Sequence, residues 1–320
     1  MKKKLLIITP VKHISNVFQD LNKYFNVKYL PDPYEDDVLN IIGQFDCIFT
    51  NPNKSKIFLG PKILASASNL KVICTASTGV NHIDIEYIKG KNIKLISLTE
   101  EREIINSISS TAEHAFALTL SSLRNIPNSF SDVKNGNWDY EKFIGRQVDK
   151  LTFGIIGYGR LGKLYSAYCL AFGAKVIVYD PYKNIENKFI KQVSDIESLL
   201  QDSDVLSFHV HVTDETIKMV NKTWFDKIKR DVLIVNTSRG DIISEHDLVK
   251  FLKNNNKAKI ATDVLEDEVR NRSKSPLLKF ASKNSDRIII TPHIGGMTKE
   301  AQEIAYGHSV SLLINYMKEN

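Results

Sequence analysis

Residues 151–180, LTFGIIGYGRLGKLYSAYCLAFGAKVIVYD, constrain the fold of this chain more than any other stretch. An apolar strand runs directly into the glycine motif Gly157-x-Gly159-x-x-Gly162, which opens a helix, and a second apolar run ends at Asp180. In such a unit the glycines permit a tight turn, close approach of a pyrophosphate, and close packing of the helix on the strand. The stretch therefore predicts a parallel sheet with a dinucleotide site at the helix N-terminus, where free amides face the phosphates.

Asp180 indicates which dinucleotide is bound. It lies 18 residues beyond the third glycine, where a carboxylate can hold both ribose hydroxyls and repel a 2′-phosphate. The sequence therefore predicts NAD, and Lys183 keeps NADP as the alternative. A glycine motif alone would also fit a purely structural turn, but here the strand, the helix and the acid accompany it.

Apolar runs alternate with helical stretches along the whole chain, which predicts two α/β domains with parallel strands and helices on both faces. Between the two series stands SSTAEHAFALTLSSLR, a predicted long helix in which Ser110 and Glu113 are expected to form a capping box. The expected strands are Leu5–Ile8, Asp46–Thr50, Lys71–Thr75 and Ile93–Ser97 in the first series, and Leu151–Ile156, Lys175–Tyr179, Val205–Val210, Val232–Val235, Lys259–Thr262 and Arg287–Ile290 in the second.

Charge and hydropathy argue against nucleic-acid and membrane roles. The formal net charge is +6 over 320 residues, but the basic residues are spread out, whereas a phosphate-binding surface needs a concentrated patch. No apolar run reaches the roughly 18 residues of a membrane helix. The N-terminal MKKKLLIITPVK lacks a cleavage site and is expected to begin the first strand rather than to act as a signal peptide.

The cysteines bear on compartment and metal binding. Cys47, Cys74 and Cys169 are odd in number, widely spaced and set among apolar residues. They fit reduced core thiols and neither a disulfide framework nor a zinc site. We therefore expect a cytoplasmic protein without a bound metal.

Four polar residues follow successive strands of the second series. Arg239 stands in LIVNTSRGDIISEHDL, Asp263 and Glu268 in ATDVLEDE, and His293 in TPHIGG. The carboxyl ends of parallel strands form the rim where open α/β sheets bind ligands. Singly, each residue could be a surface or turn residue; together they predict a site in which a guanidinium grips a carboxylate and a histidine moves a proton.

The sequence as a whole resembles the D-isomer-specific 2-hydroxyacid dehydrogenases. The resemblance is carried, in the family's order, by ASTGVNHID, STAEHAFAL, GIIGYGRLG, HVHVTDET, VNTSRG, TDVLEDE and TPHIGG. It implies a Rossmann NAD-binding domain, residues 105–293, inserted into a flavodoxin-like substrate-binding domain formed by residues 1–104 and 294–320. It also implies a homodimer and a small 2-hydroxy or 2-keto acid as substrate.

The resemblance assigns roles to individual residues. Arg239 matches the substrate-binding arginine, His293 the acid/base, and Glu268 the partner that keeps this histidine protonated for reduction. Asp263 matches the residue near the nicotinamide carboxamide. The remaining expected cofactor contacts are Gly157, Gly159, Arg160, Leu161, Gly162, Asp180, Thr237, Thr78 and Gly296.

Substrate contacts are expected from the first domain. The STGV loop matches the family's loop that presents backbone amides to the substrate, through Ser77, Thr78 and Gly79. Asn53 and Lys54 follow an expected strand, and a lysine there can hold a second anionic group; a solvated surface lysine is the equal alternative. Phosphoglycerate, glycerate, hydroxypyruvate, lactate-like and larger acids all remain open.

One departure and several rival functions accompany the resemblance. His211 stands where the family has proline, and we expect it to point into solvent rather than to reshape the cofactor loop. The chain ends soon after His293, so no C-terminal regulatory domain is expected. An NAD(H)-sensing, corepressor-like binding protein without turnover is the alternative function, and phosphite or formate oxidation is a further enzymatic one.

Overall fold

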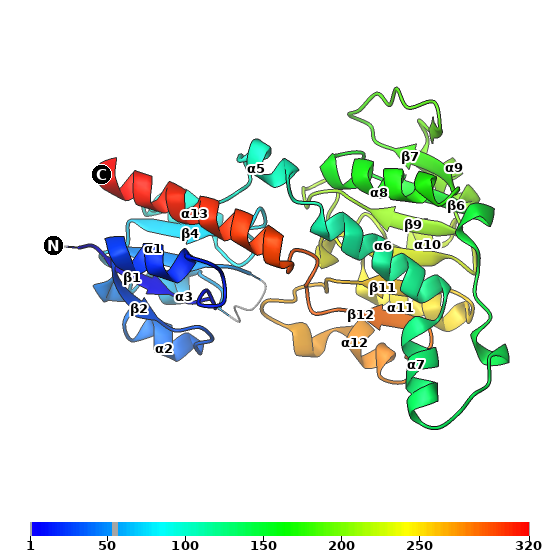
Figure 1. The fold of residues 1–320 in the computed structure, drawn as a ribbon, viewed down its shortest axis with the longest axis horizontal. Coiled ribbons are helices and arrows are strands. Elements are labelled where there is room, and N and C mark those ends of the chain that lie inside the picture. Colours follow the sequence, from blue (N-terminus) through cyan, green and yellow to red (C-terminus); the bar gives the residue numbers. More distant parts are fainter. Residues whose placement is uncertain (1, 53–56, 320) are drawn as a thin grey trace. The chain divides into compact units, whose positions relative to one another are not determined.

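The structure is a computed structural model that describes residues 2–52 and 57–319. The chain divides into two compact units, Met1–Ile108 with Gly296–Asn320, and Ser109–Gly295 (Figure 1). The assignment of a substrate-binding and an NAD-binding role to domains with the predicted boundaries stays a prediction, because compactness does not say what each unit binds.

The first unit is built on a five-stranded sheet with the order β2-β1-β3-β4-β5, in which every pair is parallel. Alternate residues of β1 face opposite sides: Leu5 and Ile7 pack under α1 and α13, and Leu6 faces the opposite core with Ile48 and Ile73. The elements are β1 (Lys4–Ile7), α1 (Val17–Tyr24), β2 (Asn26–Tyr29), α2 (Glu35–Leu39), η1 (Ile42–Gln44), β3 (Cys47–Thr50), α3 (Pro61–Leu64), β4 (Val72–Thr75), α4 (Ile85–Gly90), β5 (Lys94–Ile96), α5 (Arg102–Asn106) and α13 (Lys299–Glu319).

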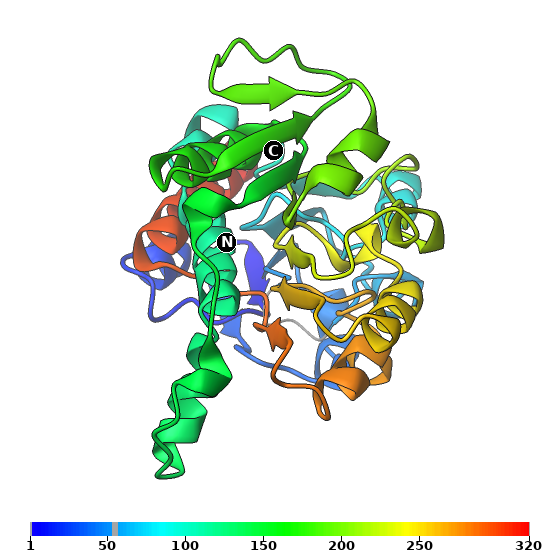
Figure 2. The same cartoon turned by 90° about the vertical axis from the view of Figure 1, so that its right-hand side faces the viewer.

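The second unit is built on a seven-stranded parallel sheet with the order β12-β11-β10-β9-β6-β7-β8 (Figure 2). One face packs under α6 and α8 and the other under α9 to α12. Its strands are β6 (Thr152–Ile156), β7 (Lys175–Tyr179), β8 (Ile190–Gln192), β9 (Val205–Phe208), β10 (Leu233–Asn236), β11 (Lys259–Thr262) and β12 (Ile288–Ile290). Its helices are α6 (Ser110–Leu123), α7 (Ile126–Lys134), α8 (Arg160–Ala171), α9 (Ile196–Asp202), α10 (Lys222–Phe225), α11 (Glu245–Asn254) and α12 (Pro276–Ala281), with short 3₁₀ turns η2 (Glu141–Phe143), η3 (Val148–Lys150), η4 (Gly240–Ile242) and η5 (Arg272–Lys274).

These strand orders confirm the predicted fold class. The first is the flavodoxin-like order, and the second is the Rossmann order with one added strand, β12. The chain enters the second unit from the first and returns to it, so one domain is inserted into the other. Among the helices of the described part, none has the length and apolar character needed to cross a membrane.

Two local predictions are wrong. The expected strands omitted β2 and β8, which lie at sheet edges and expose part of their side chains, so that neither forms an apolar run. The capping box of Ser110 and Glu113 does not form. Ser109, one residue earlier, donates its hydroxyl to Glu113 at 2.5 Å, and the Ser110 hydroxyl is buried without a partner in the described part of the chain.

Leu6→Ala tests the core of the first sheet. Leu6 is fully buried in β1, which pairs with a strand on each side, so we expect the change to lower the free energy of unfolding by about 2–5 kcal/mol. Urea denaturation followed by circular dichroism measures it. The control Lys28→Ala, at an exposed position of the neighbouring β2, should stay within about 0.5 kcal/mol. Equal effects of the two changes would contradict this description of the sheet.

Candidate active site

The glycine turn after β6 has the features that the sequence predicts. Gly157 has φ +91°, and a Cβ added there would lie 2.6 Å from the carbonyl oxygen of His209. A Cβ on Gly162 would lie 2.0 Å from the carbonyl oxygen of Gly157, so the helix approaches the turn too closely for any side chain. A Cβ on Gly159, the residue before α8, would meet no atom of the described residues within 4 Å. The turn is thus closed on the protein side and open at Gly159, which fits a pyrophosphate lying against it.

The first turn of α8 and the end of β7 complete this part of the site. Arg160 and Leu161 form the first turn of α8, where the first amides of a helix have no partner within the helix itself. Asp180 follows β7, and its carboxylate accepts the backbone amides of Tyr158 (2.7 Å) and Tyr182 (2.9 Å). These bonds fix the carboxylate next to the glycine turn, the position expected for a ribose contact.

The loop after β9 borders the same turn. The imidazole of His209 contacts the hydroxyl of Ser207 at 2.9 Å and packs at 5.0 Å from the ring of Tyr165. Burial lowers the pKa of His209 to about 3, so this histidine is neutral at physiological pH. His211 is exposed, as predicted, and its carbonyl oxygen accepts the hydroxyl of Thr216.

Arg239 follows β10 on a loop that local packing keeps rigid. Asn236 accepts the amide of Ser238 at 3.0 Å and donates to the carbonyl oxygen of Arg239 at 2.9 Å. The guanidinium donates to the carbonyl oxygen of Ser238 at 2.6 Å. A Cβ on Gly240 would lie 1.9 Å from the carbonyl carbon of Leu265, so only glycine lets this loop meet the segment that leads to Glu268.

Burial lowers the pKa of Arg239, and the nearby carboxylates of Glu268 and Asp241 oppose that shift. Because an arginine starts from a very high pKa, the guanidinium stays positive. It is therefore a fixed, half-buried cation at the end of β10.

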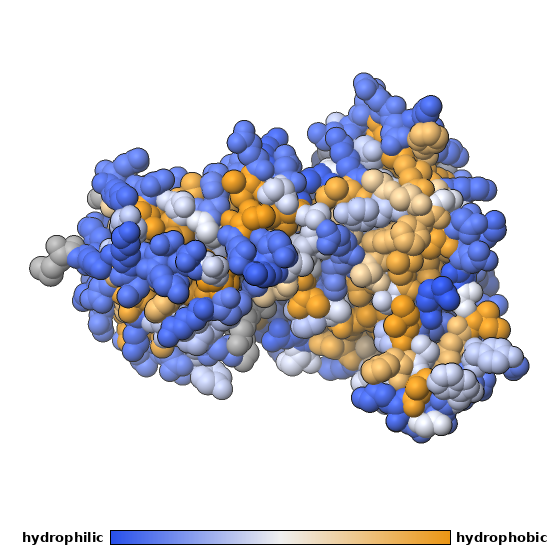
Figure 3. Space-filling model, viewed as in Figure 1, coloured by the Kyte–Doolittle hydropathy of each residue, from blue (hydrophilic) through white to orange (hydrophobic). Residues whose placement is uncertain are grey.

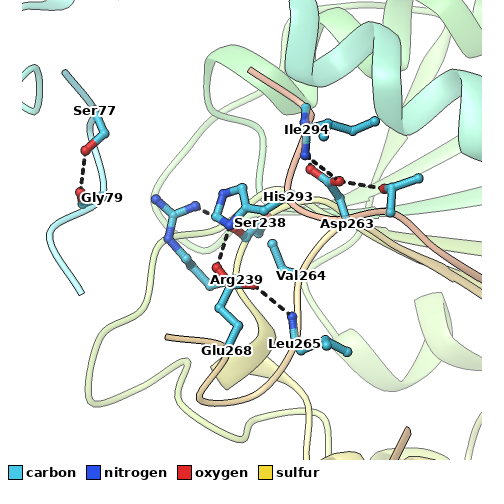
Figure 4. Close-up of polar contacts among 12 residues, drawn as sticks. Ser77, Gly79, Ser238, Arg239, Asp263, Val264, Leu265, Glu268, His293 and Ile294 are labelled. Atoms are coloured by element: carbon cyan, nitrogen blue, oxygen red, sulfur yellow. Dashed lines mark hydrogen bonds and ion pairs between the residues drawn. The ribbon is translucent and has the colours of Figure 1, made fainter. Parts of the chain in front are cut away.

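His293 and Glu268 form a direct pair (Figure 4). Nδ1 of His293 lies 2.5 Å from Oε1 of Glu268, and Oε2 of Glu268 accepts the amide of Leu265 at 3.1 Å. Both side chains are largely buried, with 18% and 13% of their surface exposed. The backbone of His293 has φ +55°, a conformation that residues other than glycine rarely adopt. The surrounding contacts must therefore hold it there.

Asp263 lies buried at the end of β11 and directs its carboxylate at the turn that carries His293. It accepts the amides of Ile294 (2.8 Å) and Gly295 (2.7 Å) and the hydroxyl of Thr291 (2.5 Å). Burial alone would raise the pKa of Asp263, but hydrogen bonds, the first of them from His114, keep it below its usual value. Its expected contact with a nicotinamide carboxamide stays a prediction.

Other described residues predicted to contact the cofactor or the substrate lie on loops of both units. Thr237 is buried after β10, and its hydroxyl has no hydrogen-bond partner within residues 2–52 and 57–319. In the first unit Ser77 donates its hydroxyl to the carbonyl oxygen of Gly79 at 2.7 Å, and the carbonyl oxygen of Thr78 accepts the hydroxyl of Thr99 at 3.0 Å. Gly296 begins the returning segment of that unit. Asn53 and Lys54 lie outside the described residues.

Two polar groups around the site, His114 and Glu245, were not predicted from the sequence. His114 on α6 contacts Thr291, 177 residues away, at 2.9 Å. Glu245 at the start of α11 is buried and accepts the amide of Glu266 (3.0 Å) and the hydroxyl of Ser275 (2.6 Å). It thereby fixes both ends of the segment that carries Glu268. No local pattern marks these residues, because their partners come from distant parts of the chain.

Two alanine substitutions separate the roles of the glycines. Gly159→Ala adds a methyl group that has no neighbour within 4 Å in the part of the chain that the structure describes, so the melting temperature should stay unchanged. NADH binding should weaken about tenfold or more, because the added methyl stands where the phosphates approach. Gly162→Ala should lower the melting temperature as well, because its Cβ would overlap backbone. Fluorescence titration with NADH and calorimetry measure the two effects. Unchanged NADH affinity in Gly159→Ala would argue against a dinucleotide at this turn.

Comparison with known proteins agrees with this geometry. A family model described as "D-isomer specific 2-hydroxyacid dehydrogenase, NAD binding domain" matches residues 116–295. A hydroxypyruvate reductase of Thermotoga maritima is 32% identical over 273 residues, which are 84% of this chain and 83% of that protein. A D-3-phosphoglycerate dehydrogenase of Archaeoglobus fulgidus is 37% identical over 252 residues, 78% of this chain and 46% of that protein. The chain thus spans about half the length of several curated relatives that it matches.

Solved structures share the fold over nearly the full chain. The crystal structure of D-lactate dehydrogenase from Aquifex aeolicus, complexed with NAD and lactic acid, has a TM-score of 0.81 and 27% sequence identity. The similarity covers 98% of this chain and 96% of that one. With a family model matched over more than half of its length, and with the glycine turn of an NAD-binding domain, the chain belongs to the D-isomer specific 2-hydroxyacid dehydrogenase family.

Proposed function

We propose that the protein is an NAD-dependent dehydrogenase that interconverts a D-2-hydroxy acid and its 2-keto acid, with His293 as the acid/base. The observation that carries the proposal is the 2.5 Å contact between His293 and Glu268 on the loops that follow β12 and β11, with the cation of Arg239 after β10 beside them (Figure 4). A proton-transfer group and a carboxylate-binding group at one edge of a nucleotide-binding sheet fit this reaction.

The pair defines which nitrogen of His293 reacts. Oε1 of Glu268 accepts a hydrogen from Nδ1, so Nδ1 stays protonated and Nε2 exchanges protons with the substrate. In the reduction, Nε2–H donates to the carbonyl oxygen of the keto acid. In the oxidation, neutral Nε2 takes the proton from the hydroxyl, and Glu268 balances the positive charge that forms.

Arg239 orients the substrate in this proposal. One of its N–H groups donates to the carbonyl oxygen of Ser238, which fixes the plane of the guanidinium. A guanidinium held in this way binds a carboxylate with two parallel hydrogen bonds. The substrate then presents a single face of its reacting carbon, which sets the D configuration.

The residues that would hold the cofactor are the ones predicted from the sequence. Gly157, Gly159 and Gly162 with the first turn of α8 would bind the pyrophosphate, and Asp180 the adenosine ribose. NAD, when bound, supplies or accepts the hydride. The further expected contacts through Thr237, Asp263, Thr78 and Gly296 belong to the same proposal.

For the substrate class we propose short acids of the phosphoglycerate, glycerate and hydroxypyruvate type. Relatives at 37% and 32% identity are named D-3-phosphoglycerate dehydrogenase and hydroxypyruvate reductase, which supports this class. In the proposal Asn53 and Lys54 hold a second anionic group, and the Ser77–Gly79 loop contacts the substrate. The three free, buried cysteines support the cytoplasm as compartment.

The first test is oxidation of NADH with a panel of 2-keto acids, with and without a phosphate. We expect turnover with one class, and a loss in kcat of about 10²–10⁴-fold in His293→Gln, because general acid/base catalysis contributes that much. NADH affinity should not change in this variant. If NADH binds and the whole panel is silent, a binding-only sensor becomes the better description.

We further propose that the protein is a homodimer that associates through the second unit. A segment made of α7 and the loop after it, residues 126–144, extends from this unit (Figure 2). It exposes six large apolar side chains: Ile126, Phe130, Val133, Trp138, Tyr140 and Ile144, with 47–88% of their surface accessible. Apolar side chains also gather over the face formed by α6 and α8 (Figure 3). A surface of this kind is typical of a contact between protein chains.

The doubly substituted variant Phe130→Asp with Ile144→Asp tests the dimer. We expect it to sediment as a monomer, because two charges would be buried in the contact. The control Phe189→Asp, at an equally exposed phenylalanine elsewhere in the same unit, should remain a dimer. A parent protein that sediments as a monomer at all concentrations would refute this proposal.

A further inference from the structure

We propose that His114 and Thr291 are positioning residues that act through the carboxylate of Asp263 to hold the turn of His293 in its reactive orientation. The inference rests on the proposed function, since it names residues that serve the same proton transfer. Neither His114 nor Thr291 belongs to the predicted set of site residues.

Asp263 holds the turn from both sides of His293. Its carbonyl oxygen accepts the amide of His293 at 2.9 Å. Its carboxylate accepts the amide of Ile294 (Figure 4) and the amide of Gly295. Before the histidine, the hydroxyl of Thr291 donates to the same carboxylate at 2.5 Å. Four hydrogen bonds to one residue thus surround a histidine that keeps an unfavourable φ of +55°.

The contacts of His114 determine its tautomer. Nε2 of His114 lies 2.9 Å from the hydroxyl oxygen of Thr291 and 3.4 Å from Oδ1 of Asp263. Thr291 gives its own hydrogen to Asp263, so it can only accept from His114. A carboxylate likewise only accepts, so Nε2 of His114 must carry a hydrogen. His114 is therefore a donor that orients the Thr291 hydroxyl and the Asp263 carboxylate together.

This arrangement has a catalytic consequence as well as a structural one. The carboxylate of Asp263 is hydrogen-bonded to the turn that carries the imidazole of His293. If the carboxylate rotates, the turn moves with it, and the position of Nδ1 relative to Glu268 changes. A displacement of about 1 Å in a reacting group can reduce the rate about a hundredfold. A residue that only stabilised the fold would change the melting temperature and leave this geometry intact.

Substitutions at both positions separate these roles. His114→Leu removes the donor, whereas His114→Gln places an amide N–H near the position of Nε2 and should restore function. Thr291→Val removes the hydroxyl at nearly constant volume. The control His246→Leu changes an exposed histidine on α11, outside this cluster. For each variant kcat, KM, NADH affinity and melting temperature are measured.

We expect kcat to fall about tenfold or more in His114→Leu and in Thr291→Val, while KM and NADH affinity change less than about twofold. The double variant should lose little more than either single one, because both act through one carboxylate. His114→Gln should recover most of the rate, and His246→Leu should match the parent. Equal loss in His114→Gln and His114→Leu, or additive losses in the double variant, would overturn the proposal.

A spectroscopic measurement tests the positioning without turnover. A proton in a short hydrogen bond between Nδ1 of His293 and Glu268 gives a far-downfield proton resonance, which is assigned by its loss in His293→Gln. This resonance should move or broaden in His114→Leu and persist in His114→Gln. An unchanged resonance in His114→Leu refutes the positioning role. A parent protein that shows the resonance but reduces no 2-keto acid would instead refute the proposed function.

Discussion

β10 pairs in parallel with β9 and with β11, and β11 pairs in parallel with β12, so the chain leaves all four strands at the same edge of the sheet. The candidate groups Arg239, Glu268 and His293 each stand on a loop that begins there. Because strand pairing fixes the edge, Glu268 and His293, 25 positions apart in the sequence, meet without any local pattern that joins them. The contacts between the loops of Glu268 and His293 depend on this strand pairing.

Buried polar groups then hold the loops at this edge of the sheet in fixed positions. Asn236 closes the loop of Arg239, Glu245 clamps the segment of Glu268, and Asp263 fastens the turn of His293. Each of these residues has its carboxylate or amide satisfied by backbone groups, so breaking one contact would leave a buried polar group unpaired. Gly240 adds a steric limit, since the loop of Arg239 touches the backbone at Leu265. The candidate catalytic groups are thus held in place by hydrogen bonds with buried polar side chains.

Several features that depend on neighbouring residues in the sequence were predicted correctly. The glycine turn, Asp180 and the central strands follow from spacing and apolar runs, and the structure places the expected strands close to their predicted bounds. The edge strands β2 and β8 were missed because partial exposure removes their apolar pattern. His114 and Glu245 were missed for a different reason. A histidine on an apolar helix and an acid at a helix start look ordinary until the fold brings Thr291 and Ser275 against them.

The two ends of the inserted unit lie close together. A Cβ on Gly295, its last residue, would stand 3.3 Å from the side chain of Thr111, near its first residue Ser109. Neighbouring ends are what an autonomous module needs in order to be exchanged between genes or circularly permuted without disturbing its core. Residues 109–295 therefore meet the geometric condition for an inserted module, since the chain enters and leaves this unit at neighbouring points.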